Sequence, residues 1–232
     1  MTIRKALAAV TLICAMAFGG STVAHAQSSA PNWNNTVVKT ERGHRVGNPN
    51  APIQLIAFES YTCPHCGRFE RESEAVLKLS YIHEGRAALE IRTVIHNPVD
   101  LAASLAVQCG PVNRFLGNHQ AIYRAQEDWL DKLSQTTSTQ RTRWSSGVLS
   151  QRMRAIASDL GFYDVMMPRG YSRSDLDRCL GDEDKAIALA NNAAADGVEF
   201  AIPGTPSFAV NGRLVANAHS WDALRPALAA AQ

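Results

Sequence analysis

Hydrophobic and polar positions in the first half of the chain predict a strand, a helix and a second strand. Residues 53–58 are almost all apolar, which is typical of a strand buried on both faces. Apolar residues then recur with helical spacing as far as Gly85, at Phe69, Val76, Leu79 and Ile82. Between residues 89 and 95 apolar and polar residues alternate, as in a strand. This order predicts a right-handed βαβ unit with parallel strands, preceded by a short strand at 36–38.

The middle of the chain is helical in pattern, from Asn97 to about Gly197. Periodic apolar positions predict helices at residues 99–107, 118–132, 147–160, 174–180 and 182–195. The polar, low-complexity segment 134–142 (SQTTSTQRT) predicts a surface loop. No strand-like run interrupts this block, so we expect a helical insertion.

The end of the chain predicts a hairpin and a closing helix. Asn211-Gly212, between the apolar runs 206–210 and 213–215, is the two-residue sequence most typical of a type I′ turn. Ser220 can cap a helix that runs through Leu228. Pro226 lies late in that helix, which places its start nearer Leu224.

The order βαβ, helices, ββα predicts an α/β fold in which an inserted helical domain interrupts a sheet domain. The expected limits are 27–97 and 198–232 for the two parts of the sheet domain, and 98–197 for the insertion.

The first 26 residues predict a cleaved secretory signal peptide. Arg4 and Lys5 precede an uncharged stretch, residues 6–18, and Ala24-His25-Ala26 is a small-x-small cleavage site. The alternative, a membrane anchor, needs about 20 apolar residues, more than this stretch provides. We therefore expect residues 1–26, with Cys14, to be removed from a protein exported to the periplasm.

Charge and cysteine content narrow the class of protein. The chain has 23 basic and 21 acidic residues, and loss of Arg4 and Lys5 makes the two numbers equal, which argues against a nucleic-acid partner. All of the five cysteines except Cys14 lie beyond the signal segment, an even number in a compartment where disulfides persist. Cys109 and Cys179 lie at the ends of two helical segments and are candidates for a structural disulfide, with two buried free thiols as the alternative.

The tetrapeptide Cys63-Pro64-His65-Cys66 lies between the first core strand and the following helix. Two cysteines at this spacing can close a small disulfide ring. At a helix start, unpaired N–H groups and the helix dipole favour a thiolate at Cys63. Pro64 suits the first helical position, and His65 can add positive charge beside the sulfur. Half of a zinc site or a structural disulfide in a loop can have the same C-x-x-C sequence. A strand before the motif and a helix after it, however, together indicate redox chemistry.

Three segments together resemble a known family. They are residues 46–53 (VGNPNAPI), 63–66 (CPHC) and 204–212 (GTPSFAVNG). In these segments the chain resembles the DsbA-like thiol:disulfide oxidoreductases of the bacterial periplasm, and the resemblance extends over almost all of the chain beyond residue 26. It implies a thioredoxin fold with an α-helical insertion and no cofactor or metal. It also implies a cis Thr205–Pro206 bond that places this loop against the Cys63 sulfur.

One position departs from the family. Many relatives have a buried Glu or Asp six residues before the first cysteine, where it helps to relay protons to the second, and this chain has Ala57 there. Glu59 points to the same side of a regular strand, which makes it a candidate for the proton relay. A solvent-facing glutamate, or one at the start of a loop, is the alternative.

Three functions compete. The first is a monomeric periplasmic oxidase that donates the Cys63–Cys66 disulfide to folding exported proteins and, by family resemblance, is reoxidised by a membrane partner. The second is an isomerase or reductase on the same fold, because Thr205 before the proline also occurs in isomerase-type relatives. The third is a metal-binding module with Cys63, His65 and Cys66 as soft ligands. It needs a further ligand, and no ligand spacing relates the other histidines beyond the signal, His44, His83, His96, His119 and His219.

Overall fold

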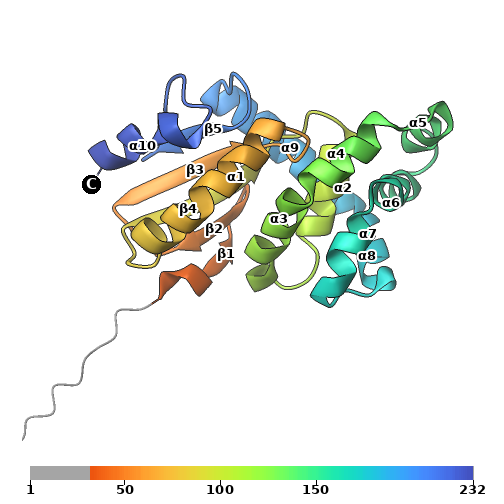
Figure 1. The fold of residues 1–232 in the computed structure, drawn as a ribbon, viewed down its shortest axis with the longest axis horizontal. Coiled ribbons are helices and arrows are strands. Elements are labelled where there is room, and N and C mark those ends of the chain that lie inside the picture. Colours follow the sequence, from red (N-terminus) through yellow and green to blue (C-terminus); the bar gives the residue numbers. More distant parts are fainter. Residues whose placement is uncertain (1–31, 232) are drawn as a thin grey trace, which may run out of the picture. The chain divides into compact units, whose positions relative to one another are not determined.

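A computed structural model describes residues 32–231, so the predicted signal peptide lies outside the described residues. Its strands form one sheet in the order β1-β2-β4-β3-β5-β6 (Figure 1). The strands are β1 (Val37–Lys39), β2 (His44–Gly47), β3 (Ile53–Glu59), β4 (Ala87–Thr93), β5 (Ser207–Val210) and β6 (Arg213–Leu214). β3 and β4 run parallel, and the other neighbouring pairs are antiparallel.

The predicted βαβ unit is confirmed. β3 leads through helix α1 (Pro64–Val76) and the π-helical segment η2 (Leu77–Ile82) into the parallel strand β4. The predicted apolar face is confirmed at Phe69 and Ile82, which are buried, but it is wrong at Val76 and Leu79, which are 39% and 68% exposed. The buried stripe of α1 instead includes the polar Glu70 and Ser73, and the wider winding of η2 then changes the phase from the α-helical period.

Helices occupy the chain between β4 and β5, which confirms the predicted helical block. They are α2 (Pro98–Val107), α3 (Phe115–Arg124), α4 (Gln126–Ser134), α5 (Ser138–Ser145), α6 (Leu149–Leu160), α7 (Phe162–Met166), α8 (Arg173–Leu180) and α9 (Glu183–Phe200). Single 3-10 turns occur at η1 (Trp33–Asn35), η3 (Val112–Arg114) and η4 (Met167–Arg169). In Figure 1, α3 to α8 gather beside the sheet, while α1 crosses one of its faces.

Two predictions within this block are wrong. The segment 134–142 is not a surface loop, because α5 starts inside it. Thr137 and Gln140 form a reciprocal capping box, and the burial of Trp144 fixes the helix on the core. The single helix predicted over 118–132 is two helices, because the backbone at Ala125 leaves helical geometry (φ −89°, ψ 4°) and ends α3 before α4 begins.

The C-terminal hairpin is confirmed in its turn type. Asn211 and Gly212 have φ of 50° and 79°, and a type I′ turn requires positive φ at both central residues. The turn joins β5, which pairs with the central strand β3, to the short edge strand β6.

The closing helix α10 (Trp221–Ala230) starts earlier than predicted. The Ser220 side chain accepts a hydrogen bond from the Ala223 N–H, and Trp221 is buried. This cap and this contact stabilise a first turn ahead of Pro226, so a start nearer Leu224 is wrong.

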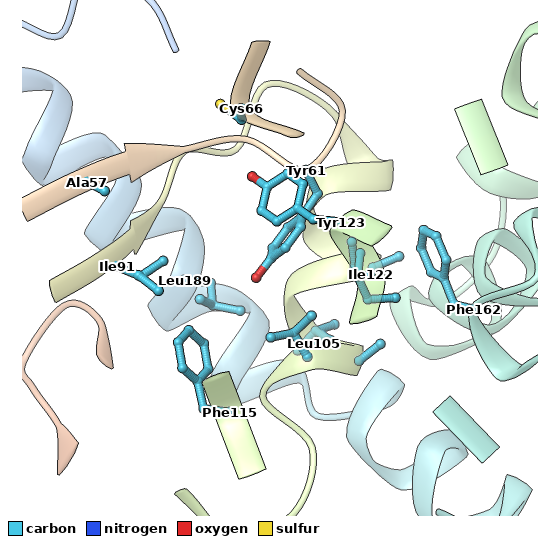
Figure 2. Packing of buried hydrophobic residues seen from close by; sticks show 14 of the residues in the cluster. Ala57, Tyr61, Cys66, Ile91, Leu105, Phe115, Ile122, Tyr123, Phe162 and Leu189 are labelled. Atoms are coloured by element: carbon cyan, nitrogen blue, oxygen red, sulfur yellow. The ribbon is translucent and has the colours of Figure 1, made fainter. Parts of the chain in front are cut away.

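A continuous hydrophobic core joins the sheet to the helices. Figure 2 shows the Tyr61 and Tyr123 rings between the sheet residues Ala57 and Ile91 and the helical residue Phe162. Because this core crosses positions 97 and 197 without a break, the domain limits set there remain predictions. No described helix is both long and apolar enough to cross a membrane.

Candidate active site

Cys63 is the residue directly before α1, where a capping side chain normally lies, and Pro64 is the first helical residue. The backbone N–H groups of this first turn have no intrahelical partner, and the positive end of the helix dipole lies here. Cys63 is half-buried, whereas Cys66, one turn further on, is fully buried. Both are free thiols in this structure. A reacting partner can therefore reach the first sulfur but not the second.

A loop from the far end of the chain covers the Cys63 sulfur. The Thr205–Pro206 peptide bond is cis, and the Thr205 carbonyl oxygen lies 3.1 Å from the Cys63 Sγ. The loop leads directly into β5, which pairs with β3. The sheet thus brings together two segments that lie 142 positions apart in the sequence.

The two thiols differ in acidity. The hydrogen bond from Cys66 is the largest cause that lowers the pKa of Cys63 to about 5. A hydrogen bond from the Thr205 side chain and the backbone N–H groups of Cys66 and His65 lower it further, and burial opposes them. Burial raises the pKa of Cys66 well above its usual range, and the hydrogen bond to Cys63 and the charge of Glu59 raise it further. At neutral pH Cys63 is a thiolate and Cys66 a thiol.

The contribution of His65 that the structure shows comes from its backbone. Its side chain is exposed, and its backbone N–H helps to lower the pKa of Cys63. Stabilisation of the thiolate by the imidazolium charge stays a prediction.

Glu59, the last residue of β3, is buried, with 2% of its surface exposed. A solvent-facing side chain is therefore wrong. Burial raises the pKa of Glu59 well above its usual range, and the charge of Glu70 raises it further. Its own charge acts on Cys66, which places the carboxyl group close to the thiol pair, while the relay role stays a prediction.

Asp100 holds the backbone just before the motif and was not among the predicted site residues. It lies fully buried in the first turn of α2. Its carboxylate accepts hydrogen bonds from Ser60 Oγ (2.8 Å), the Thr62 N–H (2.9 Å) and the His96 N–H (3.0 Å). In the sequence it looks like an ordinary acidic residue of a first helical turn, so no local signal identifies it.

Gln126 holds the motif from the other side. Buried at the start of α4, its Nε2 donates to the carbonyl oxygens of Tyr61 (2.7 Å) and Cys63 (2.8 Å). Its Oε1 would lie 1.9 Å from a Cβ atom at position 67, so only glycine allows this approach. The break between α3 and α4, which the sequence pattern did not predict, is where this residue lies.

Among the described residues, the side chains of the CPHC motif do not belong to a cluster of candidate metal ligands. Among residues 32–231, one group of three ligand-type side chains has its atoms within 4.8 Å of one another, and it consists of Glu59, Glu70 and His119. Cys63, His65 and Cys66 are outside it. The histidine of this group showed no ligand spacing in the sequence, since its two partners lie in other elements.

Comparisons with known proteins agree with this arrangement. The family model described as thioredoxin matches residues 39–230. A crystal structure of a protein-disulfide isomerase from Novosphingobium aromaticivorans is 43% identical, covers 82% of this chain and 98% of its own, and has a TM-score of 0.79. The Wolbachia pipientis alpha-DsbA1 structure is 15% identical with a TM-score of 0.65, over 85% of this chain and 94% of its own, a likeness of fold.

A relative from Rickettsia prowazekii has the provisional name protein-disulfide oxidoreductase. It is 29% identical to this chain over 170 residues, which make up 72% of this chain and 53% of that protein. The chain therefore spans about half the length of the curated relatives it matches. Since the thioredoxin model covers the sheet, the cysteine motif and the cis-proline loop together, the chain belongs to the thioredoxin family, and its helical block gives it the DsbA-like form of that fold.

Proposed function

We propose that this protein is a thiol:disulfide oxidoreductase that donates a Cys63–Cys66 disulfide to other proteins. The observation that supports it best is the difference between the two sulfurs, with an accessible Cys63 of pKa about 5 and a buried Cys66 of raised pKa. Stabilisation of the Cys63 thiolate stabilises the dithiol form, which makes the disulfide form a stronger oxidant.

The reaction proceeds by two displacements. A substrate thiolate attacks the Cys63 sulfur of the disulfide form, the Cys63–Cys66 bond breaks, and Cys66 takes the electron pair and a proton. The second substrate thiolate then attacks the substrate sulfur of this mixed disulfide, and Cys63 leaves as a thiolate. The substrate gains a disulfide, and the protein gains two electrons.

The proposal gives each of the remaining site residues a role that its position supports. Pro64 starts the helix whose N–H groups face the thiolate. Thr205 and Pro206 lie beside Cys63, where a substrate backbone can align. Glu59 is the buried acid placed to exchange a proton with Cys66.

Substrates and surroundings belong to the same proposal. The substrates are cysteine-containing exported proteins, and a membrane redox partner restores the disulfide. The protein acts as a monomer in the periplasm. The basic, apolar and small-residue sequence of residues 1–26 supports export.

An isomerase or reductase is the second candidate. The relative with 43% identity is described as a protein-disulfide isomerase, and Thr205 occupies the position before the cis-proline. The reduction potential against glutathione separates the two. A potential well above that of the glutathione pool supports an oxidase, whereas one near or below it supports an isomerase or reductase.

Thiol trapping tests the assignment of the cysteines. In Cys66→Ser, we expect mixed disulfides between Cys63 and substrate proteins to accumulate, because the second thiol is needed for release. In Cys63→Ser, disulfide transfer should be lost. Acid quenching, alkylation and non-reducing gels measure both, and the double variant is the control that traps nothing. Full turnover by Cys66→Ser, or half the wild-type rate in Cys63→Ser, would contradict the assigned roles.

A further inference from the structure

Three ionisable side chains from three elements meet inside the protein. Glu59 ends β3, Glu70 lies on α1 and His119 on α3, and they are 2%, 7% and 0% exposed. The His119 Nε2 lies 3.4 Å from Glu70 Oε1 and 3.9 Å from Glu59 Oε2. The proposed disulfide exchange uses neither Glu70 nor His119.

Three buried polar atoms of this cluster have no hydrogen-bond partner of good geometry, although Glu70 and Tyr123 lie near enough to Glu59 to affect its pKa. Both carboxylate oxygens of Glu59 and the Nε2 of His119 are buried and unpaired. Buried polar atoms of proteins are nearly always paired, and separations of 3.4 and 3.9 Å exceed those of good N–H···O bonds. Ligands at about 2.0–2.2 Å from a tetrahedral Zn²⁺ lie about 3.3–3.6 Å from one another. The shorter separation fits this spacing, and the longer one is close to it.

The other ring nitrogen of His119, Nδ1, already has a hydrogen-bond partner. Its Nδ1 lies 2.9 Å from the hydroxyl oxygen of the buried Tyr61. When Nδ1–H donates to this oxygen, the Nε2 lone pair faces the two carboxylates. A histidine that binds a metal is usually oriented by such a bond from its second nitrogen.

The cluster offers two carboxylate ligands to a cation. Among the described residues, the ion pairs of Glu59 and Glu70 are both with His119, and no lysine or arginine pairs with either. Without an ion, burial raises the pKa of Glu59 and so favours its protonated form. A divalent ion displaces this proton on binding and offsets the negative charge of the two ligating carboxylates. Glu70 also lines a surface pocket with Ser73, Glu74 and Gln120, so it is the member of the cluster that lies nearest to the surface.

We propose that Glu59, Glu70 and His119 form a binding site for a divalent transition-metal ion, with Zn²⁺ as the best fit. Two carboxylates and one imidazole suit this ion, whereas Ca²⁺ needs six to eight oxygen ligands. A Glu59 carboxylate bound to the ion cannot take a proton from Cys66. The metal site and the predicted relay are therefore alternative states of one carboxylate, and this links metal binding to the neighbouring thiol pair.

Metal binding by the oxidised protein tests the proposal, because the closed Cys63–Cys66 disulfide removes the thiol ligands. Equilibrium dialysis against Zn²⁺ with elemental analysis should give one ion per chain, and the visible spectrum of bound Co²⁺ reports the ligand geometry. Glu70→Gln and His119→Asn should each weaken binding at least tenfold. The exposed matched controls Glu72→Gln and His83→Asn should bind as the wild type does.

Thermal unfolding provides the second measurement, and circular dichroism verifies that each variant is folded. Zn²⁺ should raise the melting temperature of the oxidised wild type in a concentration-dependent way, since it binds only the folded state. Glu70→Gln should need at least tenfold more Zn²⁺ for the same shift. If His119→Asn does not fold, Glu70→Gln decides. The proposal is wrong if no saturable binding occurs, if Glu70→Gln binds like the wild type, or if only the reduced protein binds the ion.

Discussion

At the scale of residues, the proposed chemistry rests on two identical side chains in different surroundings. The sequence predicted the part of this difference that is local, because Pro64 and the apolar pattern place Cys63 at a helix start. The Thr205 carbonyl oxygen, 3.1 Å from the Cys63 sulfur, belongs to a distant segment. Only the family resemblance predicted that this segment lies against Cys63. The burial of Cys66 depends on packing that no pattern within the motif reports.

The low pKa of Cys63 predicts how the stability of the reduced protein depends on pH. The thiol titrates near 8.5 in the unfolded chain and near 5 in the folded protein. Because the folded pKa is lower, the stabilisation is fully present above the unfolded value and is lost as pH falls through the folded value. The oxidised protein has no Cys63 thiol and serves as the reference. Calorimetry of both forms should show the melting temperature of the reduced form falling relative to the oxidised form between about pH 8 and pH 4. A constant difference would contradict the low pKa.

His65→Ala tests whether the imidazolium charge contributes to that pKa. We expect a higher Cys63 pKa, followed by thiolate absorbance, and a lower reduction potential. One pKa unit is about 1.4 kcal/mol, or about 30 mV for a two-electron couple, so the two shifts must move together. His83→Ala, at another exposed histidine, is the control. If neither quantity changes, the backbone N–H of His65 is its whole contribution. A potential that falls at constant pKa would mean that His65 acts in another way.

At the scale of elements, periodicity predicts the existence of helices and strands better than their ends. It failed at α5, where a capping box and one buried tryptophan stabilise a helix whose other residues are polar. It also failed along α1, where Glu70 and Ser73 occupy the buried stripe. In both cases a tertiary contact decided positions at which local composition predicted otherwise, and at α5 the local capping box acted together with it.

Asp100, in the first turn of α2, holds the loop that precedes α1. The substitution Asp100→Asn measures how much this contact contributes to stability. The two Asp100 oxygens accept bonds from Ser60, Thr62 and His96. An amide replaces one acceptor by a donor that faces buried donors, so we expect unfolding in urea to cost about 2 kcal/mol less. The Cys63 pKa should also rise as the preceding loop loosens. Asp128→Asn, exposed in the first turn of α4, should change stability by less than about 0.5 kcal/mol. Equal effects of the two substitutions would mean that Asp100 does not hold this loop.

At the scale of the whole molecule, the sequence predicted the order of the strands and helices, but it did not predict which distant side chains contact one another. The order of strands and helices along the chain predicted a sheet interrupted by helices. Side chains from α2, α3 and α4 meet the end of β3 only because the helical block packs against the sheet through a shared core. The side chains around Glu59, and those that hydrogen-bond to the backbone near the cysteine motif, are brought there by that packing. A single sequence does not show which helices pack against the sheet.

The disulfide between Cys109 and Cys179 joins the region just after α2 to α8 across a separation of 70 residues. Closing a loop of this length restricts the unfolded chain, and such bridges typically contribute about 2–4 kcal/mol. Cys109→Ala/Cys179→Ala should therefore lower the free energy of unfolding by about this amount, while the Cys63 pKa stays near 5 because the bridge touches no residue of the motif. Urea unfolding with Cys63 and Cys66 kept oxidised measures the first quantity, and thiolate absorbance of the reduced variant measures the second. As a control, strong reductant, which also opens the Cys63–Cys66 disulfide, should make the wild type as stable as the reduced variant. If the variant were as stable as the wild type, the bridge would not restrict the unfolded chain as argued, and a shifted Cys63 pKa would mean that the helical block sets the acidity of the active site.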